Sequence, residues 1–408
     1  GYAGQTHSQI QTLNEINVED LPRFSSGLKE LDRVLGGGIV PGSAILIGGS
    51  PGAGKSTLLL QVMCQQASSK SALYVTGEES LQQVAMRARR LGLPDDKLMM
   101  LAETNVEMIC DLALKQKPQI MVIDSIQVMH VSDVQSAPGS VSQVRESAAY
   151  LTRFAKQHHI AMFIVGHVTK DGSLAGPKVL EHCIDCSMML EGESDGRFRT
   201  LRSHKNRFGA VNELGVFGMT DKGVKEVGNP SAIFLSRSDS QAPGSVVMVI
   251  WEGTRPLLVE IQALVDYSQL NNPRRVTVGL EQNRLAMLLA VMHRHGNVQM
   301  NDQDVFVNVV GGVKVSETAA DLAVAAALIS SVTGRPAPKR TVFFGEVALS
   351  AELRQVAQSD ARLKEAAKLG FDNAVMPRPR KTSAQQSQIN LSQPTTLADL
   401  IDIMGGID

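Results

Sequence analysis

One octapeptide has the residue types and spacing of a phosphate-binding loop. It fits the pattern Gly-x-x-x-x-Gly-Lys-Ser/Thr in full and reads Gly49-Ser50-Pro51-Gly52-Ala53-Gly54-Lys55-Ser56, with Thr57 directly after it. In such a loop successive backbone N–H groups point at phosphate oxygens, and the helix that follows adds its partial positive charge. Lys55 is expected to reach the β- and γ-phosphates and Ser56 to complete the coordination of Mg²⁺. The sequence therefore predicts a site for ATP or ADP together with Mg²⁺.

A second acidic element supports this prediction. Four apolar residues lead to a carboxylate in Ile120-Met121-Val122-Ile123-Asp124. This pattern is typical of a buried central strand that delivers its last side chain to the carboxyl edge of a sheet, where ligands bind in open α/β folds. Asp124 is expected to hold Mg²⁺ through water, opposite Ser56.

Hydrolysis also requires a base that orients the attacking water. Glu78 and Glu79 follow the apolar segment Tyr74-Val75-Thr76 and are the candidates. Acids are also favoured in the first turn of a helix, so one of the two can serve as a cap; we favour Glu78 as the base. Gln127 and His167 are candidate sensors of the γ-phosphate, although His167 is equally consistent with a structural role.

The elements that must position these groups alternate along the chain. Strands are predicted at residues 44–47, 72–76, 120–124, 160–166 and 187–190, and helical spacing is found at 80–91, 106–115 and 141–157. Buried apolar strands separated by helices are typical of an α/β fold with a parallel sheet. The phosphate-binding loop has the strand before it and the helix after it that it needs.

Composition is that of an ordinary globular protein. The 408 residues are 43% hydrophobic and carry a net charge of −1, which argues against a surface that is basic throughout. The length suggests two to three domains. No apolar run approaches the ~18 residues of a membrane helix, and no signal peptide is recognisable, so no membrane partner and a cytoplasmic location are expected. The four cysteines do not suggest a disulfide framework.

A five-residue segment makes the sequence similar to a known family. Lys205-Asn206-Arg207-Phe208-Gly209 resembles the signature of the bacterial RadA/Sms family of RecA-like ATPases, and the segments 35–42, 74–80 and 166–172 fit the same resemblance. The resemblance implies a DNA-dependent, helicase-like ATPase of DNA repair and homologous recombination. Such proteins form hexameric rings on single-stranded and branched DNA, promote branch migration or unwinding, and act with the RecA recombinase.

The resemblance also assigns a role to the signature itself. Lys205 and Arg207, two apart on a strand, share a face and are expected to project toward a neighbouring subunit or to couple to DNA. Without the resemblance, an ordinary solvated basic patch would be the simpler interpretation. That patch would comprise Arg199, Arg202, His204, Lys205 and Arg207.

Two polar loops are the expected DNA contacts of a RecA-like ring. They span residues 130–142 and 169–182 and contain Ser140, Lys170 and Lys178. Hydroxyls, amides and a few cations suit phosphate contacts, whereas the loops have no aromatic side chains on which bases could stack.

Cys183 and Cys186 form a single Cys-x-x-Cys pair, and a zinc site needs four ligands. We interpret both as structural. The family carries a four-cysteine zinc module ahead of its ATPase domain. The first residue here is Gly1 rather than Met, so we expect that module to be missing and no zinc to be bound through it.

The C-terminal part resembles a Lon-type protease domain. Residues 1–22 are interpreted as a linker or tail, 23–237 as the RecA-like ATPase domain, and 238–408 as an α+β Lon-protease-like domain. Lon peptidases use a Ser nucleophile and a Lys base, but Ala319 and Arg362 stand at those positions, and an arginine stays protonated. We therefore expect an inactive scaffold. An ATP-dependent protease with a shifted dyad, drawn from Ser316, Thr318 and Lys364, is the rival interpretation.

A third class is a non-motor switch, in which ATP controls assembly or partner binding with slow hydrolysis. The phosphate-binding loop, Asp124 and the glutamate pair are the same in a switch and in a motor. Stimulation of turnover by DNA distinguishes the two.

Overall fold

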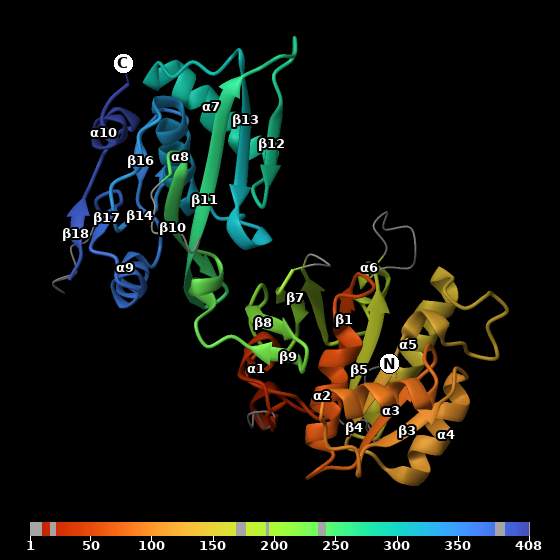
Figure 1. The fold of residues 1–408 in the computed structure, drawn as a ribbon. Coiled ribbons are helices and arrows are strands. Elements are labelled where there is room, and N and C mark those ends of the chain that lie inside the picture. The colour runs from red at the N-terminus through yellow and green to blue at the C-terminus, as the bar shows by residue number, and fades with distance from the viewer. Residues whose placement is uncertain are drawn as a thin grey trace. The chain divides into compact units, whose positions relative to one another are not determined.

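The computed structural model describes residues 10–16, 22–168, 177–192, 196–235, 242–379 and 388–407. The chain divides into two compact units, Gly1–Val227 and Gly228–Asp408, and each is described by itself (Figure 1). The division falls earlier than the expected boundary after residue 237. The reason is a short 3-10 helix, η3 (Pro230–Ile233), after which the buried Phe234 accepts a hydrogen bond from the backbone N–H of Glu260 (2.7 Å). Residues 230–234 therefore belong to the second unit.

The first unit is built on one nine-stranded sheet. Its spatial order is β3-β2-β4-β5-β1-β6-β7-β8-β9. The strands are β1 (Ala44–Gly49), β2 (Ala72–Thr76), β3 (Met99–Ala102), β4 (Ile120–Asp124), β5 (Ala161–His167), β6 (Cys186–Glu191), β7 (Phe198–Asn206), β8 (Leu214–Thr220) and β9 (Gly223–Glu226). The helices are α1 (Lys29–Leu35), α2 (Lys55–Gln66), α3 (Leu81–Arg90), α4 (Val106–Gln116), α5 (Val141–Gln157) and α6 (Pro177–Leu180), with the 3-10 turns η1 (Leu13–Glu15) and η2 (Ile126–Val128).

The sheet is mainly parallel, as predicted. The six strands from β3 to β6 pair in parallel, and β7, β8 and β9 add an antiparallel extension. The five predicted strands agree with β1, β2, β4, β5 and β6 to within two residues at each end. The strand β3, which is only partly buried, and the three strands of the extension were not predicted.

Alternating side chains of the parallel strands enter two separate cores. One core packs α1, α2 and α3 against residues such as Ile45, Tyr74 and Val122, and the other packs α4 and α5 against Leu46 and its neighbours. Since both faces of each central strand are covered, these strands are apolar at successive positions rather than alternating. This burial explains why they were recognisable in the sequence.

Parallel pairing aligns the C-terminal ends of neighbouring strands. Thr76 of β2 pairs with Asp124 of β4, and Gly49 of β1 pairs with His167 of β5. The loops that leave these four strands therefore start at one edge of the sheet. This edge is where a ligand binds in an open α/β fold.

The second unit has a seven-stranded mixed sheet in the order β12-β13-β11-β10-β14-β17-β18, and a small β15-β16 pair. Its strands are β10 (Ser245–Glu252), β11 (Arg255–Tyr267), β12 (Arg275–Val278), β13 (Gln303–Val309), β14 (Thr341–Phe343), β15 (Glu346–Val347), β16 (Leu353–Arg354), β17 (Asn373–Val375) and β18 (Asn390–Ser392). Its helices are α7 (Gln282–Gly296), α8 (Asp321–Thr333), α9 (Ser359–Lys368) and α10 (Leu397–Ile403), with 3-10 turns η4 (Val310–Gly312) and η5 (Thr318–Ala320). β10 and β11 form an antiparallel hairpin, and the almost entirely buried α8 packs on both.

Candidate active site

The phosphate-binding loop connects β1 to α2 as the motif requires. Gly49 ends β1 where the chain runs against β6: a Cβ atom at this position would lie 2.6 Å from the carbonyl oxygen of Leu190. Gly54 precedes α2 with φ +102°, a conformation that favours glycine. Two of the motif's glycines are therefore required by the backbone. The N-terminus of α2 faces the loop that it follows.

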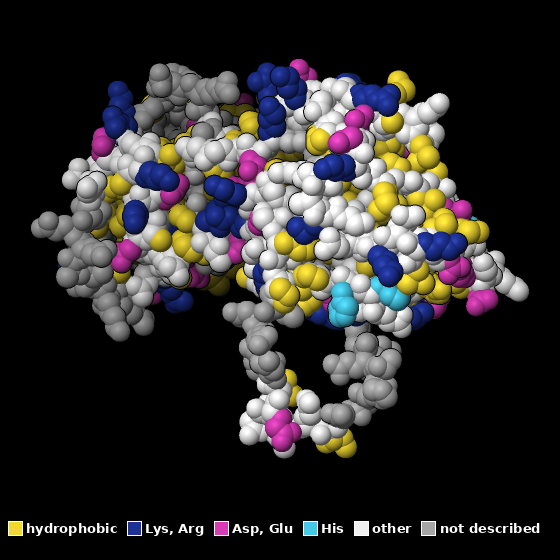
Figure 2. Space-filling model, turned by 90° about the horizontal axis from the view of Figure 1, so that it is seen from below, with side chains coloured by type: hydrophobic (Ala, Val, Ile, Leu, Met, Phe, Trp, Pro, Cys, Tyr) yellow, Lys and Arg dark blue, Asp and Glu magenta, His cyan; other side chains and the backbone are white. Residues whose placement is uncertain are grey.

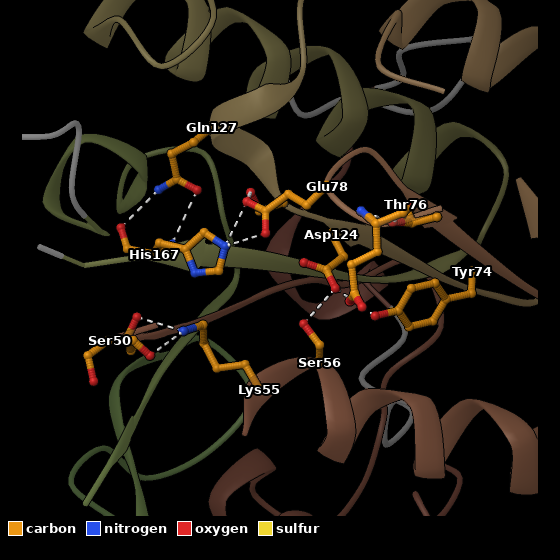
Figure 3. A network of polar contacts seen from close by, with 12 residues as sticks. Ser50, Lys55, Ser56, Tyr74, Thr76, Glu78, Asp124, Gln127 and His167 are labelled. Carbon is orange, nitrogen blue, oxygen red and sulfur yellow. Dashed lines mark hydrogen bonds and ion pairs between the residues drawn. The ribbon is translucent and has the colours of Figure 1, made fainter. Parts of the chain in front are cut away.

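Lys55 lies inside this loop and is almost completely buried. Its Nζ donates to the carbonyl oxygens of Gly49 (2.7 Å) and Ser50 (2.8 Å), as Figure 3 shows. Burial lowers the pKa of Lys55 to about 8, and the carboxylates of Asp124 and Glu78 partly oppose this shift. The ammonium group is thus held where the loop would cradle phosphate oxygens.

Asp124 is the most buried acid of the site, with 2% of its surface exposed. Its Oδ2 accepts hydrogen bonds from Ser56 Oγ (2.6 Å) and from Tyr74 Oη (2.7 Å). Burial raises the pKa of Asp124 above its ordinary value, and these two hydrogen bonds oppose the rise. Asp124 Oδ1 is buried and has no hydrogen-bond partner among the described residues.

These oxygens fit a divalent cation. An unpartnered buried carboxylate oxygen is costly unless something else satisfies it, and Mg²⁺ prefers carboxylate and hydroxyl oxygens. Ser56 and Asp124 are therefore the residues that would hold Mg²⁺. Glu78, Asp124 and His167 each offer one ligand atom within 4.8 Å of the others.

The structure separates the two adjacent glutamates. Glu78 lies beside His167, whose Nε2 is 2.8 and 2.9 Å from the two carboxylate oxygens, and it also accepts a hydrogen bond from Ser125 (Figure 3). The hydrogen bond with His167 is the main cause of its lowered pKa. Glu79 instead forms an ion pair with Arg87 of α3 (2.6 Å). Only Glu78 is grouped with Asp124 and His167.

Gln127 and His167 are also brought together. The Gln127 side chain donates to the carbonyl oxygen of His167 (3.0 Å) and accepts from its N–H (3.2 Å). The amide of η2 thereby fastens the end of β5, while the imidazole remains turned toward Glu78. Both proposed sensors thus lie in the site. The imidazole of His167 contacts Glu78 directly, whereas Gln127 contacts only the backbone of His167.

The Lys205–Gly209 signature is not one regular strand, contrary to our expectation. β7 ends at Asn206, whose Oδ1 accepts a hydrogen bond from the N–H of Phe208 (2.9 Å) and so favours a turn. Arg207 belongs to this turn. The argument that Lys205 and Arg207 share a strand face is therefore wrong, although both contact the same neighbouring segment.

That segment lies at the edge of the sheet opposite the phosphate-binding loop. Lys205 donates to the carbonyl oxygen of Glu181, and Arg207 contacts Asp185 Oδ1 (3.2 Å). Asp185 also accepts from the N–H of Ala44, the first residue of β1 (2.8 Å). Since the phosphate-binding loop follows the last residue of β1, these cations are one strand length away from their own chain's nucleotide site.

Phe208 and Gly209 fix the turn against the end of α1. Arg23 donates to the carbonyl oxygens of Phe208 and Leu35. A Cβ atom at Gly209 would lie 2.9 Å from the Cα of Gly36, so the two glycine backbones are in direct contact. The signature therefore has a packing role within its own chain.

The sequence analysis missed Arg199. Grouped with a possible solvated patch, it is 3% exposed and donates from Nε to the carbonyl oxygen of Ala53 in the phosphate-binding loop (3.0 Å). Arg199 shares the buried face of β7 with Leu201 and Ser203, and only the structure shows this burial. Tyr74 was also missed; a tyrosine within a buried apolar strand needs a hydrogen-bond partner.

The expected DNA loops are only partly described. Ser140 caps α5 by accepting from the N–H of Gln143. The buried Gln143 side chain in turn bonds the backbone of Val131, Val134 and Ser136, and so folds the first loop. Lys170 lies outside the described residues, and Lys178 lies in α6.

Charge is spread over the surface that Figure 2 shows. Lys and Arg side chains are interspersed there with acidic and apolar ones. This agrees with 40 basic against 41 acidic residues in the chain. Within the described residues no helix is long and apolar enough to cross a membrane.

Cys186 is the first residue of β6 and is buried, and Cys183 lies in the turn before this strand and is partly buried. Burial raises the pKa of Cys186 to about 12. The group of possible metal ligands among the described residues contains neither cysteine.

In the second unit, the positions at which we expected the Lon dyad form a different contact. Ala319 is completely buried, and Arg362 pairs with the carboxylate of Glu317, which also accepts from the N–H of Trp251 (2.8 Å). Arg362 also donates to the carbonyl oxygen of Val249 (2.9 Å). A buried guanidinium, which stays protonated, thus stands in place of a base.

The alternative dyad is not assembled. Ser316, Thr318 and Lys364 are all exposed. In the described part of this unit, no hydrogen bond joins either hydroxyl to the lysine.

Nucleotide affinity measured without divalent metal should fall as the pH rises above about 8. The pKa of Lys55 is about 8 in the protein, and contact with phosphate raises it in the complex. Binding then takes up a proton, so affinity should fall by up to about tenfold per pH unit. A fluorescent ADP titrated in EDTA across this range measures the slope. Lys55→Arg stays protonated and should give a flat profile; equal slopes in the two proteins would contradict the assignment.

Arg362→Met should destabilise the second unit by about 3–5 kcal/mol, because Glu317 would lose its buried ionic partner. Trp251, the single tryptophan of the chain, reports urea unfolding of this unit through its fluorescence. The matched control is Arg354→Met. Arg354 is exposed, and its ion pair with Glu352 is long, with 3.7 Å between Nε and Oε2. The control should change stability by less than about 1 kcal/mol; similar losses in both variants would refute the structural role of Arg362.

The chain is similar to two family models and to curated proteins of known name. The family model described as "ATPase: KaiC" matches residues 24–108, and that of "Subunit ChlI of Mg-chelatase" matches residues 273–380. DNA repair protein RadA of Haemophilus influenzae is 68% identical over 408 residues, which cover 100% of this chain and 88% of that protein. RadA of Escherichia coli is 69% identical over 378 residues (92% and 82%), and that of Pseudomonas aeruginosa 61% over 404 residues (99% and 89%). The chain therefore belongs to the RadA family of DNA repair proteins, and its first unit is a RecA-like P-loop ATPase.

Proposed function

We propose that this protein is a DNA-dependent ATPase that works as a ring-shaped motor on single-stranded and branched DNA in recombination and repair, with RecA as its partner. One observation supports it best: Lys55, Asp124 and Glu78 lie together at the edge where four parallel strands end. Membership of a family of RecA-like repair ATPases supports ATP as the substrate and DNA as the polymer on which the motor acts.

The residues divide the work of phosphoryl transfer to water. The backbone of residues 49–54 and the Lys55 ammonium bind and orient the phosphates. Ser56 and Asp124 hold Mg²⁺, which supplies charge neutralisation on the phosphate oxygens. Glu78, ionised at neutral pH, accepts a hydrogen bond from the attacking water and takes up its proton.

His167 determines where that carboxylate points. Its imidazole contacts both oxygens of Glu78, and its backbone is held by Gln127. Loss of the γ-phosphate on hydrolysis would change the position of Glu78, and its contact with His167 would transmit this change to the end of β5. We assign Gln127 and His167 the sensor role on this basis.

We propose that Lys205 and Arg207 act on a neighbouring subunit of a hexamer, or couple to DNA. Both lie at the sheet edge opposite their own phosphate-binding loop, so neither reaches its own nucleotide. A cation supplied in trans stabilises the charge of the transferring phosphate. Ser140, Lys170 and Lys178 are the proposed DNA contacts.

No specific observation favours the peptidase. The contact of Arg362 with Glu317 occupies the position of the Lon base, and Ala319 has no nucleophilic atom. We propose that the second unit is a proteolytically inactive scaffold.

Glu78→Gln should lower kcat for ATP by at least about 100-fold while ATP binding is retained, because a positioned base contributes about 10²–10⁴-fold. The matched control is the neighbouring substitution Glu79→Gln, which removes the ion pair with Arg87. It should leave kcat within about tenfold and lower stability by at most about 1 kcal/mol. The reverse ranking of the two kcat values would assign the base to Glu79.

Single-stranded DNA should stimulate ATP turnover, and rising salt should weaken the stimulation because phosphate contacts release counterions. The measurement is the ATPase rate with and without DNA at low and moderate salt. Lys55→Ala should have no turnover under any condition. Turnover that DNA leaves unchanged would refute the motor and favour an ATP switch; hydrolysis of a peptide substrate, lost in Lys364→Ala, would instead favour the protease.

A further inference from the structure

The two oxygens of the Asp124 carboxylate have different surroundings. Oδ2 accepts two short hydrogen bonds, from Ser56 (2.6 Å) and from Tyr74 (2.7 Å). Oδ1 is buried and has no partner among the described residues. Figure 3 shows the phenol and the serine hydroxyl on the same side of the carboxylate. The carboxylate is therefore oriented, with one oxygen saturated and the other left open.

Ser56 alone cannot be responsible for this orientation. Its hydroxyl has one proton, which it gives to Oδ2, and lone pairs that are needed by the divalent cation. Its position consequently depends on the bound ligand. The Tyr74 hydroxyl is not expected to bind the nucleotide or the cation. Among the described residues it forms a hydrogen bond only with Asp124.

The Tyr74 side chain is also rigid. It is completely buried and belongs to the core formed with α2 and α3. It stands on β2, which pairs with β4 so that Tyr74 is opposite Val122 and Thr76 is opposite Asp124. The phenol thus reaches diagonally along the adjacent strand, and packing around its ring determines where the hydroxyl lies.

We propose that Tyr74 is a positioning residue that holds Oδ2 of Asp124 and thereby keeps Oδ1 directed at the divalent cation of the nucleotide complex. The proposal rests on the proposed ATPase function. According to this proposal, a residue in the apolar core beside the sheet contributes to the affinity for the metal ion. A hydrogen-bonded partner behind a metal-binding carboxylate typically contributes about 10–100-fold to metal affinity.

The test is Tyr74→Phe, which keeps the ring and removes only the hydroxyl. Mn²⁺ serves as the probe, and its binding to the protein with ADP is measured by electron paramagnetic resonance. Mn²⁺ affinity should fall by about 10–100-fold, while ADP affinity in EDTA stays near the wild-type value. The melting temperature should fall modestly, because the buried carboxylate loses one hydrogen bond. The Mg²⁺ concentration for half-maximal ATPase should rise by a similar factor, with kcat at saturating Mg²⁺ largely retained.

The matched control is Tyr150→Phe, which removes a phenol hydroxyl from α5, and it should change none of these values. Unchanged Mn²⁺ affinity in Tyr74→Phe would overturn the proposal. A parallel loss of Mn²⁺ affinity and of metal-free ADP affinity would also overturn it, because it would show a packing role only. Wild-type protein that binds ADP but does not bind Mn²⁺ in its presence would refute the metal site itself. Wild-type protein that binds both but is not stimulated by DNA would refute only the motor.

Discussion

The buried carboxylate of Asp124 is the constraint around which the first unit is organised. An ionised acid in the interior is unfavourable unless hydrogen bonds or a cation compensate for it. Ser56 from the phosphate-binding loop and Tyr74 from the adjacent strand supply two of these bonds, and Lys55 adds a nearby positive charge. Lys55 and Ser56 stand on α2 and Tyr74 on β2, so the carboxylate on β4 is compensated only when these three elements are assembled. Folding and preparation of the site are therefore the same event.

β7 links two parts of the molecule that are distant from each other. Near its start, Arg199 supports the phosphate-binding loop, and at its end lies the signature from Lys205 to Gly209. Arg199 bonds the carbonyl oxygen of Ala53 in the loop. The signature bonds backbone carbonyl oxygens of Glu181 and Asp185. One strand thus spans the sheet from its nucleotide edge to the opposite edge. A chain that offers cations to a neighbour in a ring would need such a connection to its own nucleotide.

The second unit contains an ion pair that joins three of its elements. The buried guanidinium of Arg362 pairs with the carboxylate of Glu317. The pair connects the start of η5, the strand β10 and the helix α9 through Glu317, Trp251 and Arg362. A buried ion pair requires both partners, because either charge alone would be left uncompensated in the interior.

The sequence by itself determined the phosphate-binding loop, Asp124 and the parallel α/β fold, because each depends on local spacing or on long apolar runs. The family membership was likewise recognisable from Lys205 to Gly209. Only the tertiary structure decided which glutamate joins the site, since Glu78 and Glu79 differ in contacts with His167 and Arg87, which are remote in the sequence or on the next helix. The same holds for Tyr74 and Arg199, whose polar atoms act across strands, and for the turn at Arg207. Spacing along a chain reports which face a residue occupies, but hydrogen bonds between strands depend on register, which forms only when the sheet does.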